Sequence, residues 1–430
     1  MNDALRFRRS RLSCCMAVAA LAGCGGAAGT MPLSHAIPSH RDAAGSYKVI
    51  YSFTGGADGA QPGSGLLDVD GKLYGTTFYG GDVSSKFCYY GCGTVFETTT
   101  AGAVRVVHRF AGIPKDGADP EAELIALNGE LYGTAATGGT NGTGAVYAMS
   151  TAGKEKLVYS FGAYGDGDGR YPVSDLLAYK GVLYGTTDYG GTYTCYSVNT
   201  CGTVFKVTTS GKETVLYSFR HDPSQGDGFW PRAGLVAINA LFYGTDLQGG
   251  ASGAGTIYTI TPAGKEAVLY GFSGRHDGAY PPGRLVVLNG EYYGTTAAAG
   301  AYGHGTIFAI NASGKEHTVY EFKGSPTDGS DPIGDLTIVG GKLYGTTYQG
   351  GKYKCSSAGY TCGTAFAVTP SGTESILHIF KGGEDGASPN GSMAYVNGSL
   401  YGTTFAGGSG SCSPSSGHGP GCGTIFEIIP

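Results

Sequence analysis

Charged residues, tryptophan and long hydrophobic runs are scarce in this chain of 430 residues. Asp, Glu, Lys and Arg make up only 14% of it, and a net charge of −5 provides no basic stripe for a phosphate backbone. We therefore expect no nucleic acid among its partners. After the first 24 residues, no apolar run is long enough to span a bilayer. Trp230 is the only tryptophan.

Glycine and tyrosine, in contrast, are abundant, with 79 and 31 residues respectively. This composition is typical of a turn-rich β-protein rather than a helical one. The tripeptide Tyr-Gly-Thr also recurs seven times at intervals of 50 to 59 residues. A period near 50 residues suits one four-stranded blade of a β-propeller. The repeats begin at Tyr74, Tyr132, Tyr184, Tyr243, Tyr293, Tyr344 and Tyr401.

Each repeat is predicted to contain two hairpins. An apolar strand such as Leu285 to Leu288 runs into Asn289-Gly290, a two-residue turn signal, and then into the Tyr-Gly-Thr strand. After a variable loop, a Gly-Thr-Val-Phe strand, a short turn and a Tyr-Ser-Phe strand form the second hairpin. Because antiparallel strands reverse direction, both long loops of each repeat should lie on the same rim. We expect function on that rim.

The two ends of the repeat region predict how the ring closes. Tyr47 to Phe53 is a Tyr-Ser-Phe strand and Gly423 to Ile429 is a Gly-Thr-Ile-Phe strand, so each is half of one hairpin. The N-terminal strand would then be the outer strand of the seventh blade, whose other strands come from residues 392–429. The sequence thus predicts an all-β, seven-bladed β-propeller with four-stranded blades over residues 47–430.

The first 24 residues indicate export. Four arginines precede a short apolar stretch, Leu12 to Leu21, as in a signal peptide. Leu21-Ala22-Gly23-Cys24 resembles the bacterial lipobox, which implies that Cys24 is lipidated, and Gly25 resembles lipoproteins sent to the outer membrane. The alternative is an ordinary secretory leader cleaved nearby. Residues 25–46 are predicted to be a flexible tether, and the lipid is the only membrane contact that we expect.

Five sub-motifs recur in order through residues 47–430: Leu-Tyr-Gly-Thr-Thr, a Gly-Gly doublet, Gly-Thr-Val-Phe, Val-Leu-Tyr-Ser-Phe and Asp-Gly-x-x-Pro. Together they resemble the GloVer tandem repeat of bacterial exported proteins. In strand order the unit is also similar to NHL-type propellers, which implies that the apolar strand is innermost. Kelch repeats would also have a repeated Trp, which this chain lacks. The resemblance implies a surface-exposed repeat protein without an established activity.

Eight further cysteines occur as pairs in the loop before the Gly-Thr-Val-Phe strand. In an oxidising compartment such pairs predict local disulfides, whereas zinc ligands would converge from two places. The predicted disulfides are Cys88–Cys92, Cys195–Cys201, Cys355–Cys362 and Cys412–Cys422.

The Asp-Gly-x-x-Pro motif allows two interpretations. Its carboxylates could ring the channel mouth and bind a calcium ion or a hydrated sugar. Alternatively, each Asp caps its own turn, Gly adopts positive φ, and Pro fixes the start of the next strand. Apart from calcium in such a ring, we expect no cofactor and no metal. The seven residues are Asp58, Asp116, Asp168, Asp227, Asp277, Asp328 and Asp385.

Aromatic residues in the same loops are candidate ligand contacts: Tyr171, Phe229, Trp230 and Tyr280. Exposed rings could stack on sugars or contact a partner protein, or they could pack between neighbouring loops. Catalytic signals are weak, because the sequence shows no nucleophile elbow, phosphate loop or His-Glu zinc signature. The sequence therefore favours a monomeric binding or scaffold module at the cell surface, for a carbohydrate polymer or a surface protein. The alternative is an extracytoplasmic lyase or glycosidase-like enzyme with a site assembled on the same face.

Overall fold

The computed structural model describes residues 46–430, except 85, 197–198, 223–225, 357–358 and 413–419. The expected signal peptide, the lipobox with Cys24, and the tether up to residue 45 lie outside the described residues. Within them, no helix is long and apolar enough to cross a membrane. The one helical element described is a short 3₁₀ turn, η1 (Gly383–Asp385).

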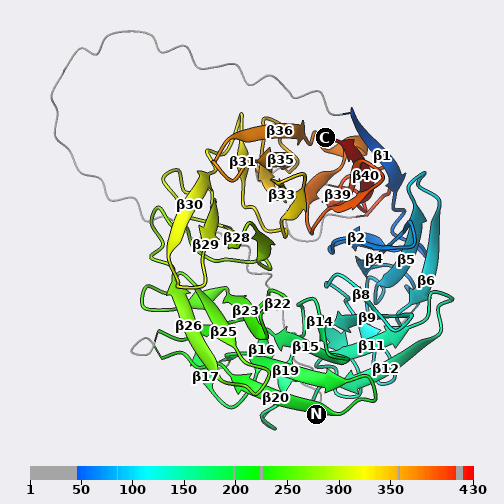
Figure 1. The fold of residues 1–430 in the computed structure, drawn as a ribbon. Coiled ribbons are helices and arrows are strands. Elements are labelled where there is room, and N and C mark those ends of the chain that lie inside the picture. Colours follow the sequence, from blue (N-terminus) through cyan, green and yellow to red (C-terminus); the bar gives the residue numbers. More distant parts are fainter. Residues whose placement is uncertain (1–45, 85, 197–198, 223–225, 357–358, 413–419) are drawn as a thin grey trace. The chain divides into compact units, whose positions relative to one another are not determined.

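Seven four-stranded antiparallel sheets form a ring (Figure 1), which confirms the predicted seven-bladed β-propeller. We number the blades 1 to 7 in the order of their inner strands. These inner strands are β3 (Leu67–Val69), β8 (Ile125–Leu127), β14 (Leu177–Tyr179), β22 (Val236–Ile238), β27 (Val286–Leu288), β32 (Thr337–Val339) and β38 (Ala394–Val396). The second strands, which carry Tyr-Gly-Thr, are β4 (Lys72–Tyr79), β9 (Glu130–Ala135), β15 (Val182–Thr187), β23 (Leu241–Asp246), β28 (Glu291–Thr296), β33 (Lys342–Thr347) and β39 (Ser399–Ala406).

The outer hairpin of each blade completes its sheet. The third strands are β5 (Thr94–Thr99), β11 (Ala145–Met149), β19 (Thr203–Thr208), β25 (Thr256–Ile260), β29 (Thr306–Ile310), β35 (Thr364–Val368) and β40 (Thr424–Ile429). The outer strands are β6 (Val104–Arg109), β12 (Glu155–Ser160), β20 (Glu213–Ser218), β26 (Glu266–Gly271), β30 (Glu316–Glu321), β36 (Glu374–Ile379) and β1 (Ser46–Ser52). In Figure 1 these outer strands follow the circumference of the ring.

Blade 7 closes the ring. Strand β1 pairs antiparallel with β40, from Ser46 opposite Ile429 to Ser52 opposite Thr424. Figure 1 shows the blue first strand beside the red last strand. The predicted closure is confirmed, and it leaves neither end of the repeat region as an unpaired strand edge.

Local sequence explains the hairpins and the core. Asn289 and Gly290 both have positive φ, at 53° and 85°, as the tight turn between β27 and β28 requires. The Tyr of each Tyr-Gly-Thr is buried in the core between blades. The Gly beside it leaves room for an aromatic ring, since a Cβ at Gly75 would lie 2.6 Å from the ring of Phe96. The repeated motif therefore packs each blade against its neighbours.

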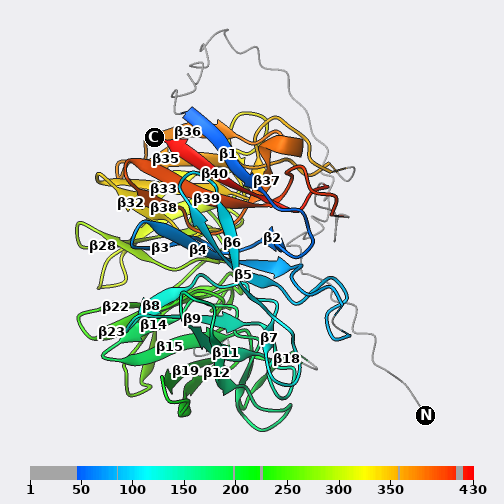
Figure 2. The same ribbon diagram turned by 90° about the vertical axis from the view of Figure 1, so that its right-hand side faces the viewer.

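Short strands mark the face that carries the long loops. They are β2 (Ala60–Pro62), β7 (Gly117–Ala118), β13 (Gly169–Arg170), β21 (Gly228–Phe229), β31 (Gly329–Ser330) and β37 (Ala387–Pro389). Their partners in the Gly-Gly region are β10 (Thr137–Gly138), β16 (Tyr189–Gly190), β24 (Gln248–Gly249) and β34 (Gln349–Gly350), with β4 and β39 serving β2 and β37. A disulfide-containing loop adds β17 (Thr194–Tyr196) and β18 (Asn199–Thr200). In Figure 2, β2, β7 and β18 lie on the same side of the ring, which we call the loop face.

All four predicted disulfides are present, each with its two Cα atoms 5.1 or 5.2 Å apart. They bridge Cys88–Cys92, Cys195–Cys201, Cys355–Cys362 and Cys412–Cys422. Disulfides persist in oxidising compartments. They therefore indicate an extracellular or periplasmic protein.

Candidate functional site in the central channel

The connection between consecutive blades leads to the centre of the ring. In each blade the residue before the motif proline has positive φ although it is not glycine, as at Asp119 and Trp230. Its backbone joins two blades: Asp119 donates its N–H to Cys92 O of blade 1 at 2.9 Å and accepts the N–H of Ala136 of blade 2 at 3.1 Å. This geometry fixes the three residues that follow the proline, and those residues reach the channel.

The first Thr of Tyr-Gly-Thr supports the same segment from the neighbouring blade. Thr134 Oγ1 donates to Ser174 O at 3.0 Å, and Thr186 Oγ1 donates to Ala233 O at 3.2 Å. Both acceptors are two residues after the motif proline. The repeat motif thus positions the channel lining as well as the blade core.

The third residue after each motif proline forms a ring of residues around the channel. Around the ring this position is occupied by Gly65, Glu123, Asp175, Gly234, Arg284, Asp335 and Ser392. One arginine therefore lies among three carboxylates and three small residues. A Cβ at Gly65 would lie 2.6 Å from Glu123 Oε2, so this glycine provides the space that the larger side chains occupy.

Arg284 lies between the three carboxylates without a short salt bridge to any of them. Its nearest nitrogens lie 3.4 Å from Asp335 Oδ2, 3.8 Å from Asp175 Oδ2 and 3.9 Å from Glu123 Oε2. Other donors hold the carboxylates in place. The backbone N–H of Glu123 donates to Asp175 Oδ1 at 2.7 Å, and the backbone N–H of Arg284 donates to Asp335 Oδ1 at 2.7 Å. Ser392 Oγ donates to Glu123 Oε2 at 2.7 Å. We call Glu123, Asp175, Arg284, Asp335 and Ser392 the channel site.

Burial sets the charge state of the channel site. It raises the pKa of the Glu123 carboxyl, although Arg284 opposes the shift. Burial also raises the pKa of Asp175, and the neighbouring Asp335 and Glu123 charges add to the rise. For Arg284 burial lowers the pKa, but the three carboxylates together raise it above its ordinary value. The site is thus an arginine surrounded by an excess of acidic groups.

A cavity of about 100 Å³ adjoins these side chains. All seven blades contribute to its lining, so it lies on the ring axis. The lining residues are Gly63, Ser64, Gly65, Glu121, Glu123, Val173, Asp175, Arg232, Ala233, Gly234, Pro282, Ile333, Gly334, Asp335, Asn390, Gly391 and Ser392.

Arg232, also in this lining, forms a separate ion pair. Its guanidinium donates two hydrogen bonds to Asp188, at 3.1 and 2.7 Å. The Asp188 charge raises the pKa of Arg232. Two hydrogen bonds to the same carboxylate hold the Arg232 guanidinium in place. The Arg284 guanidinium, in contrast, lies 3.4 to 3.9 Å from the nearest oxygens of three acids.

The motif aspartates do not form the ring that the first interpretation required. Each carboxylate instead turns toward the outer strand before it and accepts a Tyr hydroxyl or bonds to a His ring nitrogen. It also accepts a backbone N–H just after that strand, as from Gly162 to Asp168 at 2.7 Å. The seven pairs are Tyr51–Asp58 (2.9 Å), His108–Asp116 (3.0 Å), Tyr159–Asp168 (2.8 Å), Tyr217–Asp227 (3.0 Å), Tyr270–Asp277 (3.0 Å), Tyr320–Asp328 (2.8 Å) and His378–Asp385 (2.9 Å).

These contacts agree with the turn-capping interpretation, with one correction concerning the glycine. Four of the seven motif glycines do not have positive φ, namely Gly117, Gly169, Gly228 and Gly329, whereas Gly59, Gly278 and Gly386 do. At Gly117 a Cβ would lie 2.6 Å from the Cβ of Ala135 on the second strand. The predicted positive φ of the motif glycine therefore holds in three of the seven repeats, whereas the residue before the proline is left-handed in all seven. In the other four repeats, glycine serves close packing alone.

The expected aromatic contacts are also placed differently. Phe229 and Trp230 are only 1% and 6% exposed and belong to the core between blades 3 and 4, so the prediction that they form an exposed contact surface is wrong. Tyr171 and Tyr280 are half-buried, and each precedes a proline in the blade connection. Large rings gain more by leaving water than by remaining exposed at the loop surface. The second interpretation, packing between loops, describes Phe229 and Trp230.

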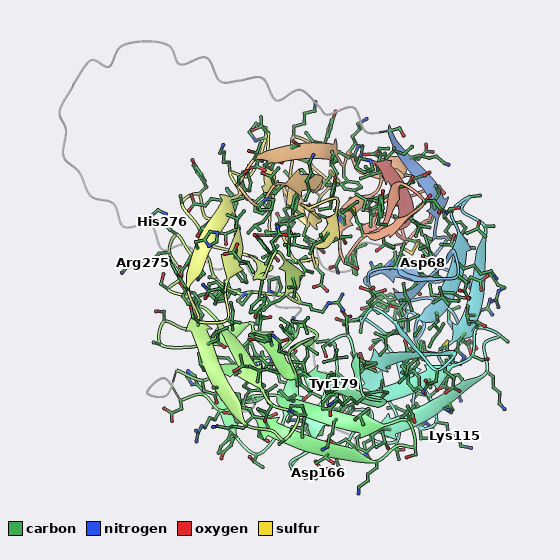
Figure 3. The ribbon with its side chains drawn as sticks, viewed as in Figure 1. Asp68, Lys115, Asp166, Tyr179, Arg275 and His276 are labelled. Carbon is green, nitrogen blue, oxygen red and sulfur yellow. A yellow bond between two sulfur atoms is a disulfide. The ribbon has the colours of Figure 1, made fainter. Side chains whose placement is uncertain are left out.

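Other aromatic side chains are exposed on the long loops. Tyr89 and Tyr90, in the loop closed by Cys88–Cys92, are 87% and 57% exposed, and Tyr164 is 70% exposed. Figure 3 shows how residues divide between rim and centre: Asp166 and His276 lie at the rim, and Tyr179 on β14 lies nearer the central opening.

Sequence analysis missed the channel site, although a signal was present. Aligning the seven repeats on the motif proline and reading three residues further would have shown three acids and one arginine at a position where the other repeats have small residues. Three ligand oxygens of Glu123, Asp175 and Asp335 lie within 4.8 Å of one another, a spacing that suits a cation. Arg284 already occupies this space, so a calcium ion would compete with its guanidinium.

The fold and this site define a seven-bladed β-propeller with a polar site on its axis. The family model for the Gloeobacter/Verrucomicrobia repeat matches residues 39–199 and 196–358. The chain belongs to this repeat family, which confirms the suspected resemblance. A search of curated sequences found no significant match.

Several solved structures are similar to this fold. A gluconolactonase from Xanthomonas campestris has 13% identity and a TM-score of 0.41 over 91% of each chain. A putative 6-phosphogluconolactonase from Bacteroides uniformis has 13% identity and a TM-score of 0.47 over 77% of this chain and 89% of its own. The tricorn protease matches with 12% identity and a TM-score of 0.40, and this chain spans only 26% of its length. At these values, no activity can be transferred to this chain.

Proposed function

We propose that this protein is an exported binding propeller that holds the end of a neutral or amine-bearing carbohydrate in the channel site. The observation that supports this most strongly is the convergence of Arg284 and three carboxylates beside a cavity lined by all seven blades. Concave sites with a few convergent polar groups are where small ligands bind. The distances of 3.4 to 3.9 Å leave these groups able to bond to a ligand.

Charge and hydrogen-bonding capacity narrow the ligand class. Three carboxylates face a single guanidinium, so a phosphate or a uronic acid would meet repulsion. Sugar hydroxyls can donate to the carboxylates and accept from Arg284, and the ammonium of an amino sugar would be attracted. A cavity of about 100 Å³ admits the end of such a ligand rather than an extended chain.

The exposed aromatics extend this proposal to a polymer. Tyr89 and Tyr90 lie in the loop between β4 and β5, and Tyr164 lies in the loop between β12 and β13. Both are long loops of the loop face. A tyrosine ring presents apolar area for stacking and a hydroxyl for hydrogen bonding. We propose that further units of the chain lie across these rings while the terminal unit enters the channel.

A glycan array with neutral, amino and uronic-acid oligosaccharides tests the proposal. We expect binding to the first two classes and a loss of at least about tenfold for Asp335→Asn, because a charged hydrogen bond contributes roughly 1.5–3 kcal/mol. Asn at position 335 keeps an oxygen that can accept the backbone N–H of Arg284. The rim substitution Lys115→Ala serves as the control. An array without binding, or equal binding by Asp335→Asn and the parent, would overturn the proposal.

One observation favours an enzyme at the same site. Burial raises the pKa of Glu123 and Asp175 next to a second acid, an arrangement that can hold a proton near neutral pH for general acid catalysis. A lyase or glycosidase-like activity would appear as turnover in a polysaccharide panel with and without added metals. Turnover that Asp175→Asn abolishes and the rim substitution Lys115→Ala preserves would favour the enzyme over the binding module.

For localisation we propose an outer-membrane or cell-surface lipoprotein, anchored through Cys24. The four disulfides support export, and the lipobox-like sequence before Cys24 supports lipidation. Labelled palmitate should enter the parent and not Cys24→Ser, and the label should fractionate with the outer membrane. A parent protein that is secreted without label would contradict the anchor.

A further inference from the structure

Two carboxylates lie close together at most of the interfaces between neighbouring blades. We call each of these seven interfaces a seam. At five of the seven seams, the motif Asp of one blade faces a Glu at the start of the next outer strand: Glu155, Glu213, Glu266, Glu316 and Glu374. In each of these glutamates Oε1 is buried and has no hydrogen-bond partner. Val104 and Tyr47 take this position at the remaining two seams.

The seam between blades 1 and 2 differs from the other four acidic seams. There the aromatic partner of the Asp is His108 on β6 rather than a tyrosine. One ligand atom each from His108, Asp116 and Glu155 lie within 4.8 Å of one another. At the other seam with a histidine, His378 and Asp385 face Tyr47 and no glutamate. Among the described residues, the seam between blades 1 and 2 is the one where a histidine ring lies beside both an Asp and a Glu carboxylate.

A second, independent observation comes from β11. Tyr147 replaces the phenylalanine of the Gly-Thr-Val-Phe strand, is fully buried, and has a hydroxyl without a hydrogen-bond partner. Burial raises the pKa of Tyr147, and the charges of Asp116 and Glu155 add to the rise, so this side chain lies near the same acidic pair. The equivalent residue is Phe205 in blade 3 and Tyr258 in blade 4, where the tyrosine hydroxyl also has no partner but no histidine stands on the outer strand beside it. The seam thus contains two oxygen atoms, one from Tyr147 and one from Glu155, that have no partner in the protein.

We propose that His108, Asp116 and Glu155 form a site for a divalent transition-metal ion of the Zn²⁺ type, with Tyr147 as the adjoining polar group. Imidazole nitrogen with carboxylate oxygen is a ligand set that suits zinc, whereas calcium takes six to eight oxygens. Metal binding would replace the bond between His108 Nε2 and Asp116 Oδ2, and the imidazole proton would move to Nδ1.

The surroundings would hold the ligands in place. Asp116 Oδ2 accepts Ala111 N–H at 2.9 Å, and Oδ1 accepts Gly117 N–H at 2.7 Å. The His108 ring packs edge-on against Phe110 at 4.8 Å. Hydrogen bonds that orient ligands support metal affinity. The His108 side chain is 18% exposed, which leaves a path from solvent.

Calorimetry with ZnCl₂ on the chelator-treated, untagged exported protein tests the site. We expect one Zn²⁺ whose affinity falls at least about 100-fold in His108→Tyr, since loss of outer-shell groups alone costs roughly 10- to 100-fold. Five seams already have tyrosine at this position, so the variant should keep its fold. Glu155→Val, which copies the seam with Val104, should show the same loss.

His378→Tyr is the matched control, because it removes an equivalent histidine from a seam without glutamate. Its zinc affinity should equal that of the parent. No Zn²⁺ binding by the parent, equal binding by His108→Tyr, or a loss confined to His378→Tyr would overturn the proposal. Binding of Ca²⁺ without Zn²⁺ at this seam would also overturn it.

Discussion

The backbone N–H of Asp119 donates a hydrogen bond to the carbonyl oxygen of Cys92 over 2.9 Å, across the connection between blades 1 and 2. The same bond occurs at the second cysteine of the other disulfides, from Trp230 to Cys201, Ser388 to Cys362 and Gln61 to Cys422. Each disulfide therefore closes a long loop and also holds the carbonyl that joins two blades.

Removing a disulfide should weaken this join. We expect Cys88→Ser/Cys92→Ser to lower the free energy of unfolding by about 2 kcal/mol, the chain-entropy value for a loop of this size. Urea denaturation without reductant measures the change. Thr143→Ser is the control, because Thr143 O accepts the equivalent bond from Tyr171 in blade 2, where no disulfide is present. An unchanged midpoint for the cysteine variant would contradict a stabilising role.

Ring closure predicts a larger effect from a small deletion. Removal of residues 46–52 takes away β1 and exposes the edge of β40, with the buried side chains of Phe426 and Ile428 beside it. We expect a large fall in melting temperature for the whole propeller, measured by circular dichroism. Deleting residues 25–45 instead should leave the melting temperature unchanged. Equal melting of the β1 deletion and the parent would refute the closure.

Trp230 provides a test of core packing against ligand contact. Since its side chain is buried between blades 3 and 4, Trp230→Ala should cost roughly 3–5 kcal/mol of stability. Thermal melting with and without an oligosaccharide separates the two roles. If the variant is as stable as the parent but loses glycan binding, the buried placement is wrong.

The glutamates at the seams predict a dependence of stability on pH. Burial and Asp168 raise the pKa of Glu213 from 4.5 to about 8, and Tyr159 also lies near it. Between pH 4.5 and 8 the folded state then binds more protons than the unfolded state, so this contribution to stability is fully present below pH 4.5 and is lost as the pH rises through 8. Melting curves at pH 5 and 8.5 should show this fall.

Glu213→Gln should reduce that fall, since one titrating group is removed. Glu130→Gln serves as the control, because hydrogen bonds from Lys156 and Tyr132 lower the pKa of Glu130, which is therefore ionised across this range. Stability that is constant or increasing between pH 5 and 8.5 would contradict the prediction.

Local patterns were sufficient to predict the blades. The Tyr-Gly-Thr period, the Asn289-Gly290 turn and the cysteine spacing each depend on residues close in sequence, and all three are confirmed. Ring closure was also predictable, because each end of the repeat region carries half of one hairpin. The channel site was not found, since Glu123 and Arg284 meet only through the ring geometry.

The expectation that Phe229 and Trp230 are exposed ligand contacts was wrong for a related reason. A loop sequence does not show whether its neighbour in space covers it, and at Trp230 the neighbouring blade does. The turn-capping interpretation of the aspartate motif agrees with the structure, but only three of the seven motif glycines have positive φ, and the residue that is left-handed in every repeat is the one before the proline. Its conformation follows from the backbone bonds to both blades, which the sequence of one repeat does not reveal.

Ser46 and Ile429 are direct partners at the edge of blade 7. Because the first and last strands of the ring are neighbours, the ring does not require the chain to begin at β1. A short linker can join these residues, and the chain can then be opened at a hairpin turn of another blade with every strand still paired. Circular permutants of this protein with new termini in a hairpin turn should therefore keep the same fold.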